Sequence, residues 1–145
     1  MLLLVCCVSN TPKEQVNQML QRVDAVENQV EVLYTQDFSY LVKEYQAIDT
    51  TVARTRDLGD TLILLQAYLQ QFETQRVVIL NNAEFSKKQL SNLRDDIIDN
   101  RFDEKTMLKY IQDEEKELHT MEAQVKYFQE KFDAQKQVVK QLRKE

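Results

Sequence analysis

His119 is the only histidine in the sequence, and so the only side chain whose ordinary pKa lies close to neutral pH. Glu115 precedes it by four residues, so the two side chains would share a face if this region is helical. Di-metal sites in helical bundles use Glu-x-x-His on two helices, and the residue three before His119 is Lys116. The spacing therefore predicts a surface histidine and no metal site.

A second candidate is the acidic stretch 95–104, DDIIDNRFDE, whose carboxylates are of the type that binds calcium. A calcium-binding loop needs oxygen ligands at alternating positions and a glycine at the sixth. Ile97 occupies the third position here, and Asn100 occupies the sixth. The stretch instead predicts a turn between two helices, with Asp103 capping the second of them.

The rest of the sequence offers little support for catalysis. Both cysteines, Cys6 and Cys7, stand in the first ten residues, and a single glycine cannot form a glycine-rich phosphate loop. The net charge is −5, with Lys and Arg interleaved among Asp and Glu, which argues against a basic surface for nucleic acid. We expect no catalytic residue, no cofactor, no small-molecule substrate and no nucleic-acid partner.

The opening segment, MLLLVCCVSN, is typical of the end of a lipoprotein signal, in which a cysteine thiol takes a diacylglycerol. Aliphatic residues precede Cys6 and Cys7, and polar residues 9–11 follow them. We expect residues 1–10 to be a signal remnant or lipid-anchor segment, with Cys7 or Cys6 as the lipid attachment site. The basic region of such a signal would lie upstream of Met1. The alternative is an apolar tail that packs on the end of the fold.

Long helices must make up the remainder, because one glycine and one proline in 145 residues leave almost no means of building tight turns. Thr11, Pro12 and Glu14 form a capping-box signature that begins the first helix, expected over 12–57. Its apolar stripe comprises Val16, Met19, Val23, Val26, Val30 and Leu33, then Tyr34, Phe38, Leu41, Tyr45, Ile48 and Val52. The slip of one position at Leu33 predicts local unwinding without an end to the helix.

Two further helices are expected over 61–98 and 103–145. Gly59 is suited to the C-terminal cap of the first helix and Asp60 to the N-cap of the second, with a kinked continuous helix as the alternative. The second stripe comprises Leu62, Leu65, Leu69, Phe72, Arg76, Ile79, Ala83, Ser86, Leu90, Leu93 and Ile97. The third comprises Met107, Ile111, Glu114, Leu118, Met121, Val125, Phe128, Phe132, Gln135, Val139 and Leu142.

Three helices of similar length joined by short turns predict an all-α fold: an elongated antiparallel three-helix bundle of long, coiled-coil-like helices. The alternative is a long two-helix hairpin that dimerises. Ile63–Leu64 and Val77–Val78 add apolar residues beside the second stripe. They exceed what one bundle needs to bury, so they are candidates for self-association or partner binding.

The stretch FSKKQLSNLRDDIIDNRFDEKTMLKYIQDEEKELHTMEAQV resembles the C-terminal half of small, uncharacterised helical lipoproteins of Bacteroidota-type Gram-negative bacteria. Those proteins carry an amphipathic helix, an Asp/Asn-rich turn and a Tyr-x-x-x-Glu helix, matched here by Tyr110 and Glu114. The resemblance implies a lipidated cysteine, Cys7 or Cys6, and a location in the cell envelope. It carries over no catalytic residue.

Together these observations predict a non-enzymatic, lipid-anchored protein on the periplasmic side of a cell-envelope membrane, acting as a scaffold, spacer or binding module. The expected partners are the membrane, through the lipid, and a protein partner or a homo-oligomer, through the helix faces. The alternative is a soluble cytoplasmic coiled-coil adaptor or self-assembling scaffold. No run of residues approaches the roughly 18 apolar positions of a membrane-spanning helix, so the lipid would be the attachment.

Overall fold

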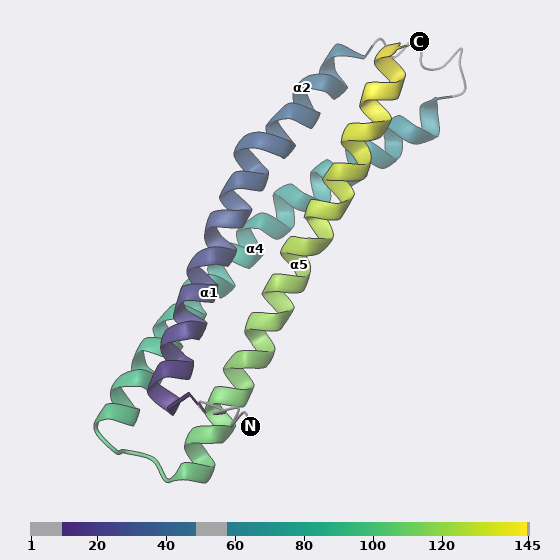
Figure 1. The fold of residues 1–145 in the computed structure, drawn as a ribbon. Coiled ribbons are helices and arrows are strands. Elements are labelled where there is room, and N and C mark those ends of the chain that lie inside the picture. The colour runs from purple at the N-terminus through teal and green to yellow at the C-terminus, as the bar shows by residue number, and fades with distance from the viewer. Residues whose placement is uncertain (1–9, 49–57, 145) are drawn as a thin grey trace, which may run out of the picture.

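The computed structural model describes residues 10–48 and 58–144, which form three long helical rods packed side by side (Figure 1). The first rod joins α1 (Pro12–Val32), a π-helical turn η1 (Leu33–Phe38) and α2 (Ser39–Ala47). The second is α4 (Gly59–Ile98) and the third is α5 (Glu104–Lys144). Successive rods run in opposite directions, so the predicted all-α antiparallel three-helix bundle is confirmed. None of the helices in the described ranges is apolar over enough of its length to cross a membrane.

The predicted capping box begins α1. The Thr11 hydroxyl accepts a hydrogen bond from the Glu14 backbone N–H at 3.3 Å, and the Glu14 carboxylate accepts one from the Thr11 N–H at 2.8 Å. Pro12 takes the first helical position, where its missing N–H would have had no partner in the helix.

The slip in the first stripe is accommodated by the π-helical turn η1. A π turn closes i→i+5 hydrogen bonds and so holds one residue more than an α turn. Val30 before the turn, Leu33 at its start and Leu41 after it are therefore all buried, although they do not share one heptad register. The Tyr34 carbonyl accepts hydrogen bonds from both the backbone N–H and the hydroxyl of Ser39. The helix continues through the slip as expected.

The junction between the first two rods differs from the prediction. The first helix does not reach residue 57, because it ends at Ala47 and Ile48 is extended (φ −76°, ψ 125°). Gly59 does not cap that helix in a left-handed conformation but opens α4, and Asp60 lies in the first turn instead of at the N-cap. The Asp60 carboxylate there still favours the helix, since it lies at the positive end of the helix dipole. Residues 49–57, which include the predicted stripe residue Val52, lie outside the described residues.

The second turn follows the prediction. The chain turns at Asn100, which has a left-handed φ of 53°, and the Arg101 N–H donates back to the Asp96 carbonyl at 2.9 Å. Asp103 caps α5, because its carboxylate accepts a hydrogen bond from the Thr106 N–H at 2.7 Å. This hydrogen bond lowers the pKa of Asp103 below its usual range.

The core lies where the three apolar stripes meet, and every described stripe residue is buried or half-buried. An aromatic cluster fills the middle of the bundle. The Phe72 ring centroid of α4 lies 4.9 Å from that of Phe132 and 5.0 Å from that of Phe128, both on α5. Phe38 of η1 completes the cluster at 5.6 Å from Phe72, so all three rods contribute to it.

Candidate functional site

The seam between the first rod and α5 is closed by ion pairs. Arg22 of α1 binds two carboxylates of α5, Glu115 at 2.5 Å and Glu122 at 2.8 Å. Farther along, Lys136 of α5 lies 2.8 Å from Asp37 of η1. The hydrogen bonds from Arg22 lower the pKa of Glu122. Burial by itself would lower the pKa of the Lys136 ammonium group, but its hydrogen bonds with Asp133 and Asp37 outweigh burial, so the pKa of Lys136 is raised.

The seam between the first rod and α4 is closed in the same way. Lys87 of α4 forms ion pairs with Asp24 and Glu27 of α1, and its hydrogen bonds to them raise the pKa of the ammonium group. Arg76, one of the two residues that interrupt the second stripe, turns its guanidinium toward the first rod. It lies 3.9 Å above the Tyr34 ring and 3.1 Å from the Glu31 carboxylate.

The seam between α4 and α5 differs from the other two. Within residues 10–48 and 58–144, no ion pair joins α4 to α5. The polar contacts between them are a long hydrogen bond of 3.5 Å from the Tyr127 hydroxyl to the Gln71 amide oxygen, and the Lys131 ammonium group 5.4 Å from the Tyr68 ring. The same ammonium group also lies 5.4 Å from the Tyr127 ring.

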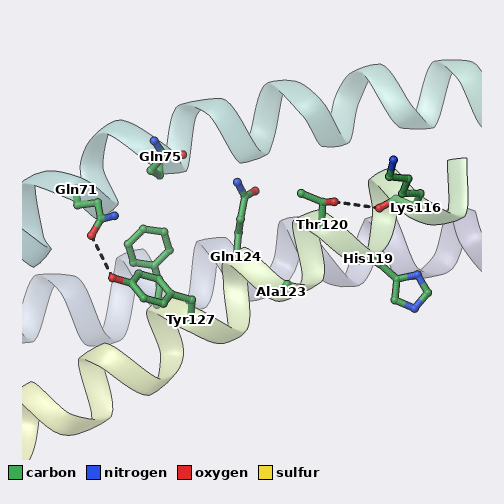
Figure 2. A pocket seen from close by; sticks show the side chains of 9 residues that line it. Gln71, Gln75, Lys116, His119, Thr120, Ala123, Gln124 and Tyr127 are labelled. Atoms are coloured by element: carbon green, nitrogen blue, oxygen red, sulfur yellow. Dashed lines mark hydrogen bonds between the residues drawn. The ribbon is translucent and has the colours of Figure 1, made fainter. Parts of the chain in front are cut away.

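An open groove of about 570 Å³ follows this seam, and we call it the α4/α5 groove. Figure 2 shows Gln124 extending from α5 toward α4, with Gln75 on the facing helix, and Tyr127 beside Gln71. The Gln124 amide oxygen is buried but accepts no hydrogen bond from the described residues. The groove thus offers mainly amide and aromatic groups, with Lys116 and His119 also among its lining residues, and such a composition suits packing against another polypeptide.

A smaller hollow of about 250 Å³ extends the groove toward the end of α4. It is bordered by Phe85, whose side chain is 63% exposed, and by Glu114 and Glu117 of α5. Burial raises the pKa of Glu114, and the neighbouring carboxylates of Glu117 and Asp113 raise it further. This end of the groove is acidic.

The outward surface of α4 beside the groove is almost free of charge. Of the exposed residues between Ile63 and Asn82, Glu73 alone is charged, and it lies two heptads before Lys87, on the side of the first rod. The remaining exposed positions define what we call the α4 outer face, apart from Gln66, whose amide oxygen accepts a hydrogen bond from the Tyr45 hydroxyl of α2. They are Ile63, Leu64, Ala67, Gln70, Gln71, Thr74, Val77, Val78, Asn81 and Asn82.

The predicted surplus of apolar residues lies on this face. Ile63 is 65% exposed and Val77 is 54% exposed, and their neighbours Leu64 and Val78 are exposed as well. Charged residues make up 30% of the whole sequence, so a charge-free face five turns long is a local departure. Depletion of charge with retention of apolar side chains is the compositional mark of a protein interface. Neither Phe85 nor the open groove was identified from the sequence.

The other candidate residues are placed as follows. His119 is 66% exposed, as expected of a surface histidine, with its Nδ1 atom 3.2 Å from a Glu115 carboxylate oxygen that Arg22 also binds. No group of three or more His, Cys, Asp or Glu side chains in the described part of the chain is placed to hold a metal ion. Cys6 and Cys7, the predicted lipid attachment sites, lie outside the described residues.

No protein-family model, curated protein or solved structure matches this chain. The resemblance to helical lipoproteins therefore stays a prediction from the sequence.

Proposed function

We propose that the protein is a non-enzymatic helical binding module that acts as a scaffold or spacer in the cell envelope. The observation that carries this proposal is the charge-free α4 outer face beside the open α4/α5 groove. The other two seams of the bundle are occupied by their own ion pairs, so this is the surface at which another helix finds unpaired apolar and amide groups.

The shape of the molecule supports a spacer role. A helix rises about 1.5 Å per residue, so α5 is roughly 60 Å long. A rod of this length holds whatever binds near one end well away from whatever binds at the other. Packed aromatic and aliphatic side chains along the whole axis stiffen it.

We further propose that a lipid on Cys7, or on Cys6, holds the rod at the periplasmic side of a membrane. The support is the aliphatic run before the two cysteines and the polar residues after them. Described helical structure begins at Pro12, only a few residues beyond the cysteines, so an attached lipid would fix one end of the rod close to the membrane surface.

Metabolic labelling with an alkyne fatty acid tests the anchor. The gene is expressed from its own locus, and wild type is compared with Cys6→Ala and Cys7→Ala. We expect label in the wild type and its loss in one of the single variants, together with a shift of the protein from the membrane to the soluble fraction. Unlabelled wild type in the soluble fraction would contradict the anchor and favour the soluble adaptor.

Site-specific photo-crosslinking in cells tests the binding module. A photoreactive residue replaces Val77 on the α4 outer face, and the matched control replaces Val32, an exposed valine of the first rod. We expect protein adducts from position 77 and few from position 32. Equal yields from the two positions, or none from position 77, would show that the α4 outer face is not a binding surface.

A further inference from the structure

We propose that the α4 outer face and the α4/α5 groove form a homodimer interface, in which a second copy of the chain packs antiparallel about a twofold axis. The axis crosses the groove at the level of Gln75 and Gln124. This inference rests on the proposed binding function and names its partner. One apolar pair on α4 and one charged pair on α5 are each symmetric about that one level.

The first distribution is apolar and lies on α4. Leu64, near one end of the α4 outer face, and Phe85, just beyond its other end, are both exposed and lie three heptads apart, so they are on the same side of the helix. Their midpoint falls between Thr74 and Gln75. A twofold axis at that midpoint sets Leu64 of each copy opposite Phe85 of the other, and Gln71 opposite Val78. Both ends of the interface then bury apolar side chains.

The second distribution is charged and lies on α5. Glu117 and Lys131 are two heptads apart on the flank that faces α4, and neither forms an ion pair with another described residue. Their midpoint is Gln124. Gln124 lines the same groove as Gln75, so this midpoint lies at the same height as the one on α4. The same axis therefore brings Glu117 of each copy to Lys131 of the other.

This symmetry is what distinguishes a second copy from an unrelated helix. An isologous interface requires that each patch be complementary to its own image under the twofold rotation. Acid facing base and apolar facing apolar, at equal distances from one level on two helices, satisfy that requirement. A foreign helix would need no such arrangement.

The surface is also large enough. From Leu64 to Phe85 the helix rises about 32 Å, and two adjacent helices together are about 20 Å wide. The resulting face of roughly 600 Å² per copy approaches the roughly 800 Å² that each partner buries in an interface of standard size. We therefore expect a reversible dimer and not an obligate one.

Sedimentation equilibrium tests the dimer directly. The full chain carries Cys6→Ser and Cys7→Ser to exclude lipid and disulfide effects, and is measured from about 1 to about 200 µM, a range that covers micromolar dissociation constants. We expect a monomer–dimer equilibrium. Val78→Glu should weaken it roughly tenfold or more, because it places a charge near the centre of the interface. Val32→Glu, the matched change on the first rod, should leave it unaltered.

Charge reversal tests the twofold register. Glu117→Lys and Lys131→Glu should each weaken the dimer roughly tenfold, and the double variant should recover most of the wild-type affinity. Circular dichroism melting shows that each variant is folded. A wild type that stays monomeric throughout, a dimer indifferent to Val78→Glu, or a double variant weaker than either single variant would overturn the proposal. A monomer that still crosslinks another protein from position 77 would overturn the dimer alone and leave the proposed function standing.

Discussion

The π-helical turn makes an unusual prediction: a residue can be deleted from the middle of the first rod at little cost. Gln36 lies inside η1, is exposed, and its side chain makes no hydrogen bond with another described residue. Its deletion should convert the π turn into ordinary α-helix. The residues on either side then keep their places, because the turn already holds one residue more than an α turn needs.

The control is deletion of Ala25, an exposed residue of α1 where the helix is regular. An α-helix turns about 100° per residue, so this deletion rotates one flanking segment away from the core whichever side moves. At least three buried hydrophobic residues are displaced in either case. They include Val16, Met19 and Val23 on one side, or Val26, Val30 and Leu33 on the other.

The difference in free energy follows from these burials. Burying an aliphatic side chain contributes about 1.5–3 kcal/mol, so the Ala25 deletion should cost roughly 5–9 kcal/mol. That is comparable with the whole stability of a typical domain, about 5–15 kcal/mol. The Gln36 deletion gives up the Ser39 hydroxyl bond to Tyr34, worth about 1 kcal/mol, and regains regular helical hydrogen bonds.

Thermal unfolding followed by circular dichroism distinguishes the two deletions. At about 3 °C per kcal/mol for a chain of this size, we expect the Gln36 deletion to shift Tm by no more than about 3 °C. The Ala25 deletion should lower Tm by more than about 15 °C or abolish the cooperative transition. Similar losses for the two deletions would refute the assignment of η1 as the element that absorbs the slip in the stripe.

Three further substitutions probe the core, the groove and a closed seam. Leu118→Asp places a charge where the native side chain is only 1% exposed, so it should lower the free energy of unfolding by about 3–5 kcal/mol and Tm by roughly 10 °C or more. Leu108→Asp, the control at an exposed site on the same helix, should shift Tm by only a few degrees. Burial and neighbouring carboxylates raise the pKa of Glu114, so the folded protein loses stability as the pH rises from the ordinary pKa of a glutamate through this raised pKa. Glu114→Gln should therefore raise Tm by about 2 °C at pH 7 and make no difference below the ordinary pKa of a glutamate. Arg22→Met should lower the free energy of unfolding in urea by roughly 1 kcal/mol at neutral pH, and this loss should shrink in high salt and as the pH falls through the lowered pKa of Glu122.

The rods and the core could be predicted because both depend on short-range pattern. A period of three and four residues identifies the buried stripe of a helix whatever it packs against, so residues such as Leu90 and Phe132 are recognisable without a partner. Caps such as Thr11 and Asp103 are equally local, since each side chain binds a backbone N–H within three residues. The stripe also revealed the slip at Leu33, but not that a single wide turn absorbs it.

The end of the first rod could not be predicted in this way. The stripe continues through Ile48 and beyond, so periodicity offers no reason for the helix to end at Ala47. A glycine suits either a left-handed cap or the first turn of a helix, and the sequence does not show which applies at Gly59. Such ends depend on the packing of the surrounding chain, which a one-dimensional pattern does not contain.

Only part of the candidate surface could be predicted from the sequence. Ile63–Leu64 and Val77–Val78 could be identified because they lie off the stripe of their own helix. The groove could not, because it depends on which flank of α4 faces α5 and which faces the first rod. Heptad stripes leave that choice open, since a three-helix bundle of either hand buries the same stripes.

The charges on α1 explain the observed hand, and with it the open seam. With α4 and α5 exchanged about the first rod, Arg22 would lie against the flank of α4 that carries Gln75, and Glu27 against the flank of α5 that carries Gln124. An ion pair would thus be replaced on each side by an unpaired charge. In the observed hand both α1 residues are paired, through Glu122 on one side and Lys87 on the other. The ion pairs that favour this hand all involve the first rod, whereas α4 and α5 meet without an ion pair in the described part of the chain; this is the seam at which we propose the second copy packs.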